Sequence, residues 1–165
     1  MPGVRIIRAS WIANALFLVS AAPFALGVDV WEAVAVGVAL LLFAVSLVVW
    51  VWAFGTAVVR SSRGDDIAVG NLFLLEGKVA TGVRTQLFSS VGICLVITAA
   101  TASANPFGVL VPMLPVGLVG LWGAKHGVFG IRAGFEPEVR PLRPRHEPAR
   151  GRRRGPTVPE HGDQE

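Results

Sequence analysis

The residues best suited to acid–base chemistry lie between residues 60 and 86 of this 165-residue chain. They are Asp65, Asp66, Glu76 and Lys78, whose carboxylates and amine are groups that general acid–base catalysis uses. Their spacing matches no catalytic motif, and the chain contains no nucleotide-binding glycine loop, Ser-His-Asp set or HExxH pair. We therefore predict that the protein is not an enzyme and binds no cofactor.

Cys94 and His126 are two isolated residues with reactive side chains. Cys94 is the single cysteine, so the chain can form no internal disulfide and no multi-cysteine metal site. It lies in an apolar block, where a cysteine packs as a small hydrophobic residue. His126 has no His, Cys or carboxylate at ligand spacing, and we predict no metal site.

A basic, proline-rich segment ends the chain. We expect residues 133–165 to be disordered, because few apolar side chains could offset the entropy of ordering. A cation near an anionic cytoplasmic leaflet gains about 1 kcal/mol. We predict contact with anionic lipids through Arg140, Arg143, Arg145, Arg150, Arg152, Arg153 and Arg154. A role in topology and solubility alone is the alternative, and the lack of aromatic residues between the arginines argues against nucleic-acid binding.

Glycines recur in the last apolar stretch on successive turns of an expected helix. Small residues let helices approach closely in lipid, and we predict a helix-packing interface at Gly117, Gly120, Gly123 and Gly127. Packing inside the protein is the first interpretation, and self-association or docking to another membrane protein is the alternative. Asn14 either ties its helix to a neighbour or lies near the membrane surface, and the sequence favours the surface position.

Long apolar stretches must position all of these residues. The chain is 53% hydrophobic and 16% charged, below the charged fraction of about 25% that is typical of soluble domains. Four stretches without interior charges are long enough to cross a bilayer as helices. They cover residues 10–28, 33–59, 87–104 and 109–126. The fold class predicted is an all-α membrane protein, a four-helix transmembrane bundle with a disordered C-terminal tail.

The connections suit such a bundle. Residues 1–9 form the N-terminus, and the two short connections join antiparallel neighbours. Residues 60–86 form a longer loop that contains an apolar segment, 67–75, too short to cross the bilayer. We expect this segment to lie at the membrane surface or to be tucked under the bundle.

The distribution of charge sets the orientation. All fifteen Lys and Arg residues precede the first stretch, lie in the loop 60–86, or lie at or beyond the end of the fourth stretch. Positive residues stay in the cytoplasm, so we predict a multi-pass protein of the cell membrane with both termini cytoplasmic. Any three-span or five-span model would split this set. Cleavage of the first stretch as a signal peptide is an alternative, since Arg5 and Arg8 precede it and small residues end it.

One run of the sequence carries a resemblance to known proteins. Leu110-Val111-Pro112 and the run from Gly117 to Gly127 are similar to small, uncharacterised multi-pass membrane proteins of actinobacteria. The resemblance covers mainly residues 60 to 132. It implies a bacterial cell membrane and brings no activity with it.

The leading hypothesis is a non-enzymatic accessory or scaffold subunit that acts by helix packing, with a homo-oligomer or a membrane protein as partner. A small oligomeric channel or transporter is the alternative, motivated by Pro112, Pro115 and the glycine series. No charged residue lies in the interior of the four stretches, the last of which ends at Lys125 and His126, and this argues against a proton-coupled pump. The scaffold hypothesis predicts association with a partner in the membrane, whereas the channel or transporter hypothesis predicts solute flux.

Overall fold

The computed structural model of the chain describes residues 3–75 and 79–131, which all belong to the compact unit Met1–Phe135. Four segments of this part are helical and are long and apolar enough to cross a membrane. Their bounds are Val4–Ala25, Asp29–Ser61, Thr81–Thr101 and Pro106–His126. The predicted all-α bundle of four membrane-spanning helices is thereby confirmed. The tail, residues 133–165, lies outside the described residues.

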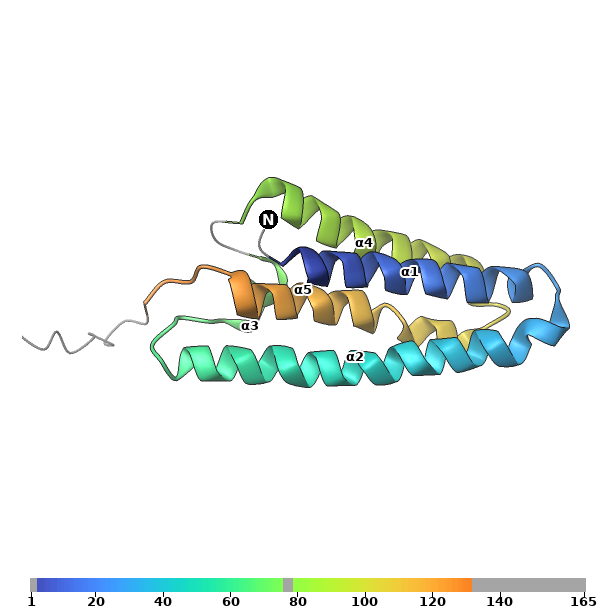
Figure 1. Cartoon of the computed structure of the whole chain (residues 1–165), viewed down its shortest axis with the longest axis horizontal. Coiled ribbons are helices and arrows are strands. Elements are labelled where there is room, and N and C mark those ends of the chain that lie inside the picture. The colour runs from blue at the N-terminus through green and yellow to red at the C-terminus, as the bar shows by residue number, and fades with distance from the viewer. Residues whose placement is uncertain (1–2, 76–78, 132–165) are drawn as a thin grey trace, which may run out of the picture. The chain divides into compact units, whose positions relative to one another are not determined.

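Each span is built around one long helix (Figure 1). The first is α1 (Val4–Ala25), and the second joins a short 3-10 helix, η1 (Asp29–Trp31), to α2 (Glu32–Ser61). The third is α4 (Thr81–Thr101), and the fourth joins the 3-10 helix η2 (Pro106–Leu110) to α5 (Met113–His126). A short helix, α3 (Val69–Phe73), lies within the loop that connects the second and third spans.

The helices begin earlier in the sequence than the apolar stretches do. Helix α1 starts at Val4 rather than at residue 10, and α4 starts at Thr81 rather than at 87. Both extra turns contain arginines, Arg5 and Arg8 in α1 and Arg84 in α4. A helix does not have to end where the hydrocarbon ends, because long basic side chains can reach the headgroup layer from it.

Helix α2 turns small residues inward and large ones outward. Its buried residues recur at intervals of three, four or seven, and most are alanine or serine: Ala35, Ala39, Leu42, Ser46, Ala53 and Ala57. Large aliphatic residues such as Leu41, Val48 and Val51 are exposed on the outside. This is the arrangement expected in lipid, where small residues allow close helix contact and large ones meet acyl chains.

Helix α5 lies between α1 and α2 and forms the centre of the bundle (Figure 1). In the fourth span 67% of the apolar window is buried, against 28% to 39% in the other three. Its most extensive contact is with α2, which runs parallel to it, since Trp50 lies beside Gly117 and Arg60 beside Ala124. The other helices pack around this pair.

Two prolines mark the beginning of α5. Pro112 is the residue before the first helical position, and Pro115 is the third residue of the helix. The first N–H groups of a helix have no partner within it, so a proline there removes no helical hydrogen bond. Neither proline interrupts the middle of α5, and the 3-10 helix η2 extends the span back to Pro106.

Candidate helix-packing site

The four glycines predicted to mediate packing all lie against other parts of the same chain. A Cβ atom at Gly117 would lie 2.8 Å from Cδ1 of Trp50 in α2, and one at Gly120 would overlap the ring of Phe73 in α3. At Gly123 it would lie 2.5 Å from the carbonyl oxygen of Leu72. Each of these glycines is buried, so any larger residue would displace a neighbour.

Gly127 differs from the other three glycines because it lies just after the end of α5. A Cβ atom on it would lie 2.5 Å from the carbonyl oxygen of Gly123 and close to the ring of Phe129. Gly127 follows the last residue of α5, and its backbone N–H donates to that same carbonyl at 2.8 Å. The glycine therefore allows the chain to turn closely around the end of α5.

Aromatic rings join helix α3 to α2, since Phe73 of α3 packs on two rings of α2. The rings of Trp50 and Phe73 stack with their centroids 4.9 Å apart, and Phe54 lies 6.0 Å from Phe73. The indole N–H of Trp50 also donates to the carbonyl of Met113 at 2.9 Å. Leu72 is buried. The apolar segment 67–75 thus packs on α2 and α5 through Phe73 and Leu72, while Val69 and Leu74 are exposed.

Arg60 joins the ends of α2 and α5. Its Nε donates to Asp65 Oδ2 at 2.7 Å, and its Nη1 donates to the carbonyls of Ala124 and Gly127, each at 3.0 Å. The guanidinium carbon lies 5.1 Å from the centroid of the Phe129 ring. The carbonyls at the end of a helix carry partial negative charge, so a cation bound there is stabilising.

A polar cluster joins α1 to α4. Asn14 Nδ2 donates to the carbonyl of Ser90 at 2.8 Å and to its hydroxyl at 2.9 Å, and the hydroxyls of Ser10 and Ser90 are 2.6 Å apart. All three side chains are buried. Asn14 thus ties its helix to a neighbour, and the surface position that the sequence favours is wrong. Hydrogen bonds of this kind contribute about 0.6 kcal/mol on average in membrane proteins.

The outward face of α4 differs from that of α2. We define its outer stripe as Thr85, Ser89, Gly92 and Ala99, which are exposed and share one side of the helix, with the exposed Val96 between Gly92 and Ala99. The buried residues, among them Leu87, Cys94 and Thr101, occupy the opposite side. A Cβ atom at Gly92 would meet nothing within 4 Å. The hydroxyl of Thr85 donates to the carbonyl of Thr81 at 3.0 Å within its own helix.

Of the four residues considered for acid–base chemistry, the structure describes Asp65 and Asp66. Asp65 is bound to Arg60, while the backbone N–H of Asp66 donates to the carbonyl of Gly130 at 2.8 Å. Glu76 and Lys78 lie outside the described residues, as do the tail arginines predicted to contact lipid. Within 3–75 and 79–131, no three His, Cys, Asp or Glu residues are grouped so that they could hold a metal ion.

The contacts of Arg60 and Ser90 are absent from the sequence-based predictions. In the sequence Arg60 is one more positive residue beside a membrane span, and Ser90 is one hydroxyl in an apolar stretch. Their partners lie 64 and 76 positions away, so only the packing of the helices reveals them. Comparison with protein-family models, curated proteins and solved structures finds no match to this chain.

Proposed function

We propose that this protein is a non-enzymatic accessory or scaffold subunit that acts by helix packing within the membrane. The observation that carries the proposal is the outer stripe of α4. Elsewhere the outward residues are mostly large aliphatics, as on α2, which suit contact with acyl chains. The outer stripe of α4 has four small residues and one larger one, Val96, and small residues there allow close contact with another helix.

The glycines of α5 do not form the proposed contact with a partner helix, which is assigned to α4. All four are used within the chain, by contacts with α2, with α3 or around the end of α5 itself. They are therefore not free to receive a partner. Gly92 is open, and its face is opposite the side of α4 that packs on the bundle. The proposed partner is a transmembrane helix of a second copy or of another membrane protein.

Gly92→Leu should separate the protein from its partner. The leucine side chain would hold the partner helix away from α4, while the fold would remain intact because no atom of the chain lies near that Cβ. Crosslinking in native membranes, followed by identification of the adducts, measures the loss of contact with the partner. Gly55→Leu is the matched control, since Gly55 is also exposed and open but lies on α2. A wild-type protein that gives no adduct would contradict the proposal.

The orientation is proposed from charge. Described basic residues near the start of α1, the ends of α2 and α5 and the start of α4 all belong to one end of the bundle. The connection between α1 and α2 carries Asp29 and Glu32 instead. The positive-inside rule places the basic end, and both termini with it, in the cytoplasm. The bacterial cell membrane is proposed from the actinobacterial resemblance.

Cysteine labelling tests this orientation. Val30 is 86% exposed in the first connection and Ser62 is exposed after α2, so each accepts a cysteine without disturbing the core. In intact cells a membrane-impermeant maleimide should label Val30→Cys and spare Ser62→Cys, and permeabilisation should expose both. Cys94 is buried, and a Cys94→Ala background removes any residual labelling. The reverse pattern would place the termini outside.

A channel or transporter remains the alternative proposal. The residues that motivate it have roles in the fold of the chain itself, because Pro112 and Pro115 begin α5 and the glycines pack within the bundle. No described contact favours it over the packing role. Absence of protein-dependent flux in liposomes is the result that would dismiss it.

A further inference from the structure

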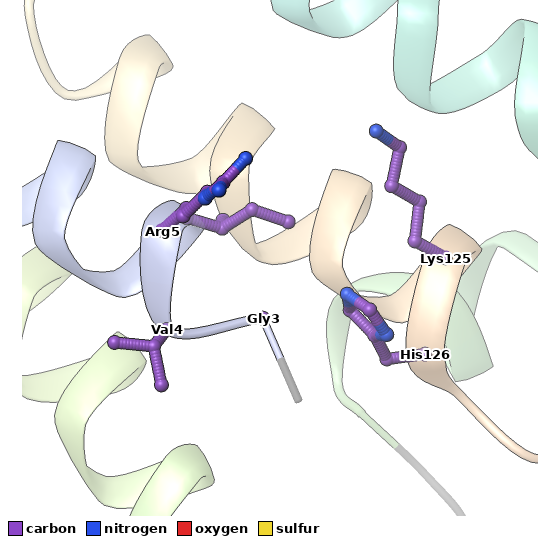
Figure 2. A pocket seen from close by; sticks show the side chains of 6 residues that line it. Gly3, Val4, Arg5, Lys125 and His126 are labelled. Carbon is purple, nitrogen blue, oxygen red and sulfur yellow. The ribbon is translucent and has the colours of Figure 1, made fainter. Parts of the chain in front are cut away.

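A pocket opens where α1 begins and α5 ends (Figure 2). It has a volume of about 480 Å³. Its lining consists of Gly3, Val4, Arg5, Ile6, Lys125 and His126. None of the six residues is acidic, and three carry nitrogen atoms that can donate hydrogen bonds. The pocket is therefore suited to an anion.

Aromatic rings hold two of the three basic side chains in place. The Nζ atom of Lys125 lies 3.9 Å from the centroid of the Trp52 ring, and the ring of His126 lies 5.6 Å from that of Trp122. An ammonium group above a ring keeps N–H donors for a further acceptor. Figure 2 shows the Arg5 and Lys125 nitrogen atoms on the same side of the pocket, with the His126 ring nearer Gly3.

The basic side chains are not neutralised by the rest of the described chain. Among residues 3–75 and 79–131 the salt bridge is that of Arg60 with Asp65, and neither Arg5 nor Lys125 takes part in it. Arg5 and Lys125 both line the pocket, and two cations in one pocket raise the local affinity for an anion. Within the described residues, no carboxylate is paired with Arg5 or Lys125.

The backbone adds to this electrostatic field. Helix α1 starts at Val4 with no acidic residue in its first turn, so its positive end faces the pocket uncompensated. Gly3 has a φ of 76°, and a Cβ atom on it would overlap the indole of Trp122. At the end of α5, Arg60 already covers the carbonyls of Ala124 and Gly127. This cation offsets part of the negative charge at that end of the helix.

We propose that this pocket binds a phosphate group. Arginine, lysine and a helix N-terminus are the groups that recognise phosphate in proteins. The pocket lies where membrane-spanning helices end, which is the depth of the lipid headgroups, so an anionic phospholipid is the favoured source. Free phosphate offers the same chemistry. This site is separate from the outer stripe of α4 and does not depend on it.

Titration of the full-length protein in a neutral detergent tests the site. The probes are phosphatidylglycerol, phosphatidylcholine and inorganic phosphate, and the readout is tryptophan fluorescence, since Trp52 and Trp122 contact the basic residues of the pocket. We expect phosphatidylglycerol to bind more tightly than phosphatidylcholine. Arg5→Gln combined with Lys125→Gln should weaken phosphatidylglycerol binding at least about tenfold, because two charge-assisted contacts are lost.

The matched control removes the same charge elsewhere. Arg8→Gln combined with Arg63→Gln leaves the pocket and the tail unchanged, and its affinity should stay within about twofold of the wild type. Equal losses in both double variants, or no loss in either, would overturn the proposal. Inorganic phosphate that binds as tightly as the lipid, with the same dependence on Arg5, would keep the phosphate site and overturn the lipid as its source. Circular dichroism and the single variant Arg5→Gln establish that folding is retained.

Discussion

Gly123→Ala is expected to destabilise the protein by about 2 kcal/mol, as overpacking of a filled core does. An added Cβ would lie 2.5 Å from the carbonyl oxygen of Leu72, and a backbone atom cannot turn aside as a side chain can. Leu72 is itself buried, so α3 would have to move away from α5. Unfolding in mixed micelles with increasing dodecyl sulfate, followed by circular dichroism, measures the change.

The direction of the stability change distinguishes a filled glycine site from an open one. Alanine is a better helix former than glycine by up to about 1 kcal/mol, so an open site should gain stability from the same exchange. Gly55→Ala on α2 is that control, because its Cβ would meet nothing within 4 Å. Gly120→Ala should lie between the two, since its neighbour is the movable ring of Phe73. Equal stabilities for the Gly123 and Gly55 variants would refute the close contact of α3 with α5.

Arg60→Ala is expected to cost about 2 to 3 kcal/mol, the upper range for hydrogen bonds made by a charged group. The change would remove the ion pair with Asp65 and the two bonds to the carbonyls at the end of α5. The loop that carries Asp65 and the chain after Gly127 would lose their common anchor. Limited proteolysis of this region and the same unfolding titration report the loss.

Two further variants separate the effect of the planar guanidinium of Arg60 from the effect of its positive charge. Arg60→Lys keeps the positive charge but not the planar arrangement of donors, so it should recover only part of the stability. Arg63→Ala removes one basic residue from the same loop, and Arg63 is exposed, so its effect should stay within about 0.5 kcal/mol. A loss as large for Arg63 as for Arg60 would show that charge alone matters.

The number and type of spans could be predicted because hydropathy acts over long stretches. A helix that crosses lipid needs many successive apolar residues, and each of the four stretches is visible without knowledge of its neighbours. The ends of the helices could not be found in this way. Arg5 and Arg84 look like boundaries in the sequence, yet they lie in the first turns of α1 and α4.

Packing roles could be predicted only where the residue type restricts them. A glycine series indicates close approach, but the sequence cannot tell that Gly123 meets Leu72 while Gly92 faces outward. Arg5 and Lys125 are far apart in the sequence, and each alone is an ordinary basic residue beside a span. The pocket between them exists only because α1 and α5 are neighbours.

The central position of α5 has a consequence for biogenesis. Synthesis proceeds from the N-terminus, so the helix that fills the centre of the bundle is the last of the four to reach the membrane. Until it arrives, Trp50 lacks the Met113 carbonyl and Arg60 lacks the end of α5. Insertion and folding are therefore separate stages for this chain. The first three spans are inserted in the lipid before α5 is available to pack between them.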